Sequence, residues 1–171
     1  YLPFAGFWRQ FGITQFVPGT NGWAPGDGHR LVTPPGLPAF IALICYEAIF
    51  SGDLGADPGQ AEYLLNISND EWFDGSIGPA QHAHHALLRA VESGLPMLRA
   101  TNSGVTFAAD PLGRITDRLA PGEPAALDVT LARKVASTPF DRFGNWPFLA
   151  LVALGLLAAL LTRNRGPRRA A

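Results

Sequence analysis

The sequence predicts an α/β layered domain, and three observations support this fold class. The segments "AFIALIC" (39–45) and "YLLNISND" (63–70) begin as apolar runs, as strands buried on both faces do. Residues 79–94 show helical spacing of apolar side chains, and further strand-like runs follow them. Alternation of strand, helix and strand along a chain is typical of α/β layers.

The predicted helix has clear start and stop signals. Pro79 suits its first turn, while Gly94 followed by Pro96 suits its end. Turn residues and apolar patterns then predict the remaining elements, which are strands at 96–102 and 104–110, a turn at 110–113, a hairpin partner at 114–120 and a last strand at 125–132. Residues 1–36 are rich in Gly, Pro and aromatic side chains, which predicts ordered loops.

Composition narrows the possible functions. The 171 residues suffice for one domain with a core, and the net charge of -1 gives no basic surface for nucleic acid, so no nucleic-acid partner is expected. His82 and His85 have the i, i+3 spacing of metal ligands, but no Cys or clustered acid completes a site. We interpret these histidines as polar-face or core residues, and we expect neither a metal nor a cofactor.

Residues 143–162 are predicted to form one C-terminal transmembrane helix. No charged residue lies between Gly144 and Thr162, and a span needs about 20 predominantly apolar residues, or about 17 at least. A core helix is the alternative, but the segment lacks the polar face of an amphipathic helix. The predicted organisation is a domain at 1–142, the membrane helix, and a basic tail at 163–171, which its arginines place on the cytoplasmic side.

Cys45, the only cysteine, is the candidate nucleophile because it follows a predicted buried strand. Open α/β sheets place their chemistry at the carboxyl ends of strands, and a thiol on the following turn is exposed there. The backbone amide of Tyr46 could donate to an oxyanion at the same point. The alternative is an inert buried thiol. The local residues supply no clear activator, since we expect Glu47 to point to the opposite face from Cys45 unless a turn brings it round, and the only lysine, Lys134, lies far along the chain.

Several motifs resemble those of one family, the bacterial apolipoprotein N-acyltransferases, which are the inner-membrane branch of the nitrilase superfamily. The motifs occur in the family's order and cover nearly the whole chain: "ICYE" (44–47), "LLNISNDEWF" (64–73), "SIGPAQH" (76–82), "LRAVESGLPMLRATNSGVT" (88–106) and "GNWP" (144–147). The resemblance implies a partial nitrilase-superfamily αββα sandwich followed by the transmembrane helix. It also implies that the chain is a C-terminal fragment, with a base Glu and a Lys upstream of Tyr1.

The resemblance implies a specific reaction. Cys45 matches the family's nucleophile, and Tyr46 and Glu47 match the two functional residues that follow it. Cys45 would take an acyl chain from a phospholipid as a thioester and pass it to the N-terminal amine of a diacylglyceryl apolipoprotein. Trp72 and Phe73 are expected to contact lipid, although a small core cluster is the alternative. The catalytic domain would face the periplasm, and this fragment alone would be inactive.

Two other functions remain open at this point. The first is a membrane-anchored amidase with the same fold, which would transfer the acyl group to water rather than to an amine. The second is a non-catalytic, degenerate module. The sequence upstream of Tyr1 would separate this second alternative from an enzyme.

Overall fold

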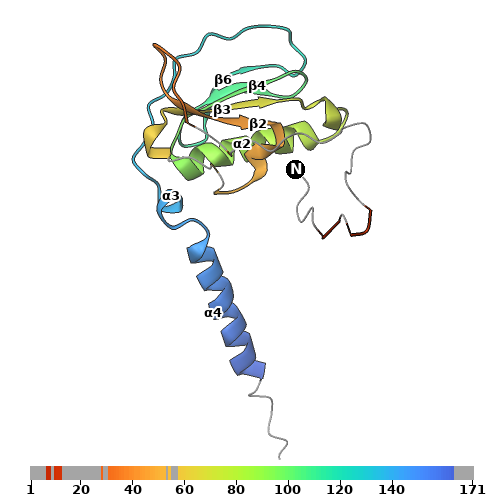
Figure 1. The fold of residues 1–171 in the computed structure, drawn as a ribbon, viewed down its shortest axis with the longest axis vertical. Coiled ribbons are helices and arrows are strands. Elements are labelled where there is room, and N and C mark those ends of the chain that lie inside the picture. The colour runs from red at the N-terminus through yellow and green to blue at the C-terminus, as the bar shows by residue number, and fades with distance from the viewer. Residues whose placement is uncertain are drawn as a thin grey trace, which may run out of the picture.

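The structure is a computed structural model that describes residues 7–8, 10–12, 28, 31–52, 54 and 58–163. These residues contain one six-stranded sheet, with helix α2 (Gly78–Ser93) packed against one face (Figure 1). In both sequence and space the strands run in the order β1 (Leu31–Val32), β2 (Phe40–Ile44), β3 (Tyr63–Ser68), β4 (Met97–Thr101), β5 (Thr106–Ala109) and β6 (Ile115–Leu119). The predicted loops at 1–36 lie largely outside the described residues.

The centre of the sheet is parallel and its flanks are antiparallel. Strands β2, β3 and β4 run in one direction, with Ile44 opposite Ile67 and Ser68 opposite Thr101. Strands β1, β5 and β6 pair antiparallel with their neighbours. Because the carboxyl ends of β2, β3 and β4 meet at one edge, residues far apart in sequence come together there.

Helix α2 covers the sheet through small side chains. Ala83, Ala86 and Ala90 are buried, and they belong to the same core cluster as Ile41 and Met97 of the sheet. The helix ends at Gly94, which has a left-handed φ of 72°. The backbone amide of Gly94 donates to the carbonyl of Ala90 at 2.9 Å. The predicted helix and its glycine stop are therefore confirmed.

Short helical turns connect the main elements. These are the 3-10 turns η1 (Cys45–Ile49), η2 (Pro58–Gln60) and η3 (Glu71–Phe73), and the helix α3 (Pro139–Phe143). Turns η1 and η3 follow β2 and β3 closely, so they stand at the edge where the parallel strands end.

The predicted strand at 125–132 is wrong. Residues 125–128 are exposed and carry no strand pairing. The chain beyond them is tied to the other end of the sheet, because Val135 donates its amide to the carbonyl of Gly94 at 2.9 Å and the Lys134 ammonium donates to the carbonyl of Ala61 at 2.9 Å. The segment therefore serves as a connection from β6 to α3 that passes the end of α2, although its apolar pattern resembles that of a strand.

The other face of the sheet has no helix against it among the described residues (Figure 1). Phe40 and Tyr63 stack on this face with ring centroids 5.1 Å apart, and both remain partly exposed, as does Leu65. The α/β class and the nitrilase-like sheet are confirmed. The described residues supply one helical layer and one sheet, and the αββα sandwich stays a prediction.

Helix α4 (Trp146–Arg163) extends away from the sheet (Figure 1). Every residue from Trp146 to Thr162 is exposed, so no side of the helix packs on the domain. Across the described part of the chain, no helix reaches the combined length and hydropathy of a membrane span. The transmembrane assignment of 143–162 therefore stays a prediction, as does the division at 142, and residues 164–171 of the tail lie outside the description.

Candidate active site

Cys45 occupies a strained elbow between β2 and η1. Its φ of 50° makes it the one residue other than glycine with positive φ in the described ranges. Such a conformation costs about 1–3 kcal/mol and persists where the surrounding structure holds it. The sharp turn leaves the thiol half-buried, with Sγ 3.9 Å from the carbonyl oxygen of Asn69, to which it can donate. This is the strand-to-turn geometry that exposes a nucleophile.

Glu47 folds back onto the elbow. Its Oε2 accepts a hydrogen bond from the backbone amide of Ile44 at 2.6 Å, so its carboxylate spans the turn that contains Cys45. The expectation that Glu47 points to the opposite face is wrong, because residues i and i+2 lie on the same face of a strand. Because the chain turns at Cys45, the side chain comes round to the same end of the strand.

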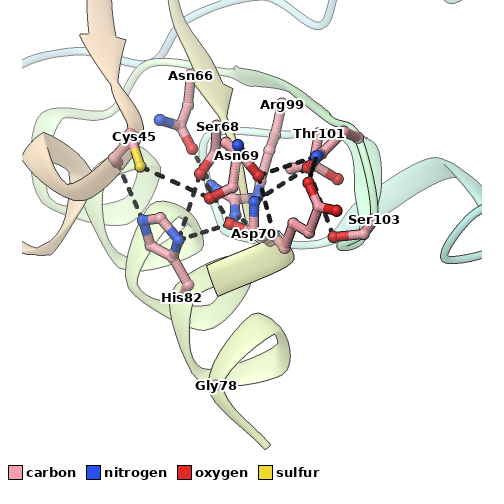
Figure 2. Close-up of polar contacts among 12 residues, drawn as sticks. Cys45, Asn66, Ser68, Asn69, Asp70, Gly78, His82, Arg99, Thr101 and Ser103 are labelled. Carbon is pink, nitrogen blue, oxygen red and sulfur yellow. Dashed lines mark hydrogen bonds and ion pairs between the residues drawn. The ribbon is translucent and has the colours of Figure 1, made fainter. Parts of the chain in front are cut away.

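A buried polar cluster lies behind the elbow, and Figure 2 shows its members converging from two strands and α2. The cluster consists of Asn66, Ser68, Asp70, His82 and Arg99. Asp70 stands at its centre with no exposed surface. The Asp70 carboxylate accepts from Arg99 Nη2 at 2.7 Å, from His82 Nδ1 at 2.8 Å and from Ser68 Oγ at 2.8 Å.

The surroundings keep Asp70 ionised. Burial alone would raise the pKa of this carboxyl, but the hydrogen bond from Ser68, the charge and hydrogen bond of Arg99 and the bond from His82 together lower it below its usual range. Burial lowers the pKa of the Arg99 guanidinium, and the charges of Asp70 and Cys45 oppose that change. The cluster is therefore a charged network with a buried ion pair.

The cluster ties the strand ends together. Asn66 donates to the carbonyl of Leu43 at 2.8 Å and accepts from Arg99. Gly104 leaves room for Asp70, since a Cβ there would overlap the carboxylate and lie 2.7 Å from its Cγ. The space beside Asp70 thus depends on a residue without a side chain.

His82 connects this cluster to the nucleophile. Its Nε2 lies 3.0 Å from the carbonyl oxygen of Cys45, and its side chain is 4 % exposed. The rings of Tyr46 and Phe73 lie near it, with centroids at 6.2 and 6.3 Å. Each ring nitrogen lies beside an oxygen that accepts hydrogen bonds, Nε2 beside the Cys45 carbonyl and Nδ1 beside the Asp70 carboxylate.

Sequence reasoning interpreted His82 only as a polar-face or core histidine. The core interpretation is correct, but the contact with Cys45 was missed. Within the described residues no three His, Cys, Asp or Glu side chains gather where they could hold a metal ion. His82 and the exposed His85 do not share a site, since His82 is committed to Asp70 and Cys45.

The two aromatic candidates differ in position. Trp72 is 77 % exposed, so the core-cluster alternative is wrong for it. Phe73 is less exposed and packs its ring against His82. Both lie in η3, next to the edge that carries Cys45, and the exposed side chains of Tyr46 and Phe50 continue the apolar surface there.

Two basic residues take structural places. Lys134 pairs with Glu62 at 3.0 Å beside the start of β3, at the opposite end of the parallel strands from Cys45. Arg89 pairs with Glu92 at 2.6 Å, and it also donates to the carbonyl of Ile49 at 3.0 Å. Neither residue supplies an activating cation at the thiol.

Comparison with known proteins agrees with this arrangement. Residues 9–138 match the model of the family described as carbon-nitrogen hydrolase. The chain is 38% identical over 167 residues to an apolipoprotein N-acyltransferase of Rhodopseudomonas palustris, covering 98% of this chain and 31% of the relative. It is 44% identical over 126 residues to that of Nitrosomonas europaea, covering 74% of this chain and 25% of the relative.

The chain thus spans about a third or less of the length of the curated relatives it matches. An amidase from Nesterenkonia sp. covers 60% of this chain at a TM-score of 0.46 and 21% identity, which is too distant to bear on the site. The resemblance indicated by the motifs is confirmed by the sequence matches. Because the family model covers most of the chain, this protein belongs to the carbon-nitrogen hydrolase family.

Proposed function

We propose that the protein to which this chain belongs transfers an acyl chain from a phospholipid to the N-terminal amine of a diacylglyceryl-cysteine apolipoprotein. The observation that carries the proposal is Cys45 on a strained, half-buried elbow at the carboxyl edge of parallel strands. Similarity to apolipoprotein N-acyltransferases over 98% of the chain supports this substrate class over small amides.

The reaction proceeds in two acyl transfers. The Cys45 thiolate attacks the ester carbonyl of the phospholipid, the ester C–O bond breaks, and the lysophospholipid leaves with a proton on its oxygen. The amine of the lipoprotein then attacks the thioester, an amide bond forms, and the thiol is released. Each attack builds an oxyanion, to which the Tyr46 amide would donate.

The activating base and lysine belong to the longer protein in this proposal. The described residues bring no lysine to Cys45, since Lys134 is engaged at the other end of the strands. The resemblance implies a Glu that moves the protons and a Lys that stabilises the oxyanion, both upstream of Tyr1. Glu47 then orients the elbow through its bond to Ile44.

A lipid surface fits the apolar parts of the chain. We propose that Trp72 and Phe73 contact lipid and that residues 143–162 anchor the domain in the inner membrane, with the catalytic domain in the periplasm. Exposed apolar side chains on all sides of α4 support the anchor, and the exposed indole of Trp72 supports the contact. The described α4 falls short of a full span, so topology mapping is the test of this part.

Mass spectrometry of the peptide that contains Cys45 tests the proposed function. The complete enzyme incubated with phospholipid should carry one acyl chain on Cys45, and Cys45→Ala should carry none. Adding a diacylglyceryl peptide with a free N-terminus should discharge the thioester and yield an N-acylated peptide. Release of free fatty acid with no acylated peptide would instead indicate an amidase-like hydrolase, and no adduct in any sample would contradict the proposal.

A further inference from the structure

His82 contacts the carbonyl of Cys45. This carbonyl belongs to the peptide group that joins the nucleophile, Cys45, to the oxyanion donor, the amide of Tyr46. The Nε2 of His82 lies 3.0 Å from that carbonyl oxygen (Figure 2). The same peptide group carries the amide N–H of Tyr46. A peptide unit is planar and trans, so its C=O and N–H point in opposite directions. Fixing the carbonyl therefore fixes the direction of the amide.

The elbow needs such a restraint. Cys45 holds a positive φ that an L-residue with a side chain adopts at a cost, and the preceding strand and following turn have ordinary geometry on both sides. The Cys45–Tyr46 peptide can still turn through ψ of Cys45 and φ of Tyr46, and that rotation would swing the Tyr46 amide away from the thiol. The bond from His82 opposes that rotation.

His82 is itself held rigidly. Its Nδ1 donates to Asp70 at 2.8 Å, and Asp70 is fixed in turn by Arg99 at 2.7 Å and by Ser68 at 2.8 Å. The ring stands in the interior with Tyr46 and Phe73 close by. The imidazole therefore presents Nε2 to Cys45 in one orientation, set by a network that spans β3, β4 and α2.

We propose that His82 is a positioning residue, which aims the Tyr46 amide at the developing oxyanion by holding the Cys45 carbonyl from behind. The proposal rests on the proposed acyl transfer at Cys45. His82 contacts neither acyl donor nor acceptor, and it transfers no proton in the reaction. Its contribution is to orient the Tyr46 amide as an oxyanion donor. The loss of such a donor in acyl-transfer enzymes slows the reaction by roughly 100- to 1000-fold.

Two reactions of the same thiol separate positioning from mere folding. Acylation of Cys45 passes through an oxyanion, whereas alkylation by iodoacetamide is a displacement at carbon that builds none. The complete enzyme, His82→Leu and His82→Gln are compared in both reactions. Leucine removes the donor to Cys45, while the glutamine amide can still reach the carbonyl. The matched controls are His84→Leu and His84→Gln, because His84 is exposed on the same helix.

We expect His82→Leu to slow acylation by roughly 10- to 1000-fold, as for a misdirected or lost oxyanion donor, and to leave the alkylation rate near that of the unmodified enzyme. His82→Gln should recover part of the acylation rate. Both His84 variants should match the unmodified enzyme. Circular dichroism of each variant shows whether the domain is folded.

Acylation is measured with phospholipid and with p-nitrophenyl butyrate, an activated ester of a different size. If the unmodified enzyme reacts with the activated ester alone, the proposed lipid substrate fails while the effect of His82 remains measurable. Equal losses of acylation and alkylation in His82→Leu, or full acylation by that variant, would overturn the positioning role. So would a His82→Gln variant that folds but acylates no faster than His82→Leu.

Discussion

Replacing Asp70 by Asn should destabilise the domain strongly, because the change removes the only carboxylate of the buried cluster. Asp70 is fully buried and accepts from Arg99 at 2.7 Å and from His82 at 2.8 Å. Asn keeps the shape but places an NH2 group against one of these donors. It also leaves the Arg99 guanidinium buried without its counter-charge. Breaking a buried pair in this way costs about 3–5 kcal/mol.

Urea denaturation of the complete enzyme in detergent, followed by tryptophan fluorescence, measures this cost. With a slope of about 2 kcal/mol per molar urea, the midpoint should fall by roughly 2 M. Asp74→Asn is the matched control, since Asp74 is exposed and, among the described contacts, its carboxylate accepts only from the amide of Gly75 at 3.0 Å. A midpoint for Asp70→Asn within about 0.3 M of the control would refute the assignment of Asp70 as the centre of the network.

The pH dependence gives an independent check with a defined sign. Because the folded pKa of Asp70 is lowered, its contribution is fully present above the unfolded value and is lost as pH falls through the folded value. The stability difference between the unmodified enzyme and Asp70→Asn should therefore be constant from neutral pH down to about pH 4, and it should shrink below that. A difference that grew on acidification would contradict the lowered pKa.

Three further predictions concern neighbouring parts of the chain. Gly104→Ala should destabilise by about 1–3 kcal/mol and slow acylation of Cys45, because the new methyl group overlaps the Asp70 carboxylate; unchanged urea midpoint and rate would contradict this. Glu47→Gln keeps an oxygen that can accept from Ile44, so we expect normal folding by circular dichroism but a loss of turnover of roughly 100-fold, and near-normal acyl transfer would make the charge dispensable. In a Cys45→Ala background, Ala170→Cys should resist an impermeant maleimide in intact cells, whereas labelling there would place the tail outside the cytoplasm.

Local signals in the sequence determined the elements and the place of the nucleophile. Unbroken apolar runs predicted β2 and β3, and Pro79 with Gly94 predicted the limits of α2, because capping and burial patterns act within a few residues. Cys45 was placed correctly at the end of β2 because a strand followed by a turn exposes its next side chain.

Only the tertiary structure decided which polar side chains meet. Asn66 and Arg99 alternate in step with the buried residues of β3 and β4. A polar residue at a buried position indicates that it has a hydrogen-bond partner, but the sequence does not identify that partner. Arg99 reaches Asp70 because two parallel strands end at the same edge, and His82 reaches both Asp70 and Cys45 because α2 packs beneath that edge. These contacts join residues 12 to 37 positions apart, so they follow from strand order and packing.

The same limit explains the error at 125–132. The apolar pattern of 125–132 is typical of a strand. However, Lys134 and Val135 form hydrogen bonds at the far end of the sheet, so the chain must run from β6 to that end. Pairing and chain direction depend on where distant segments are anchored, and that is a property of the folded chain rather than of any window of its sequence.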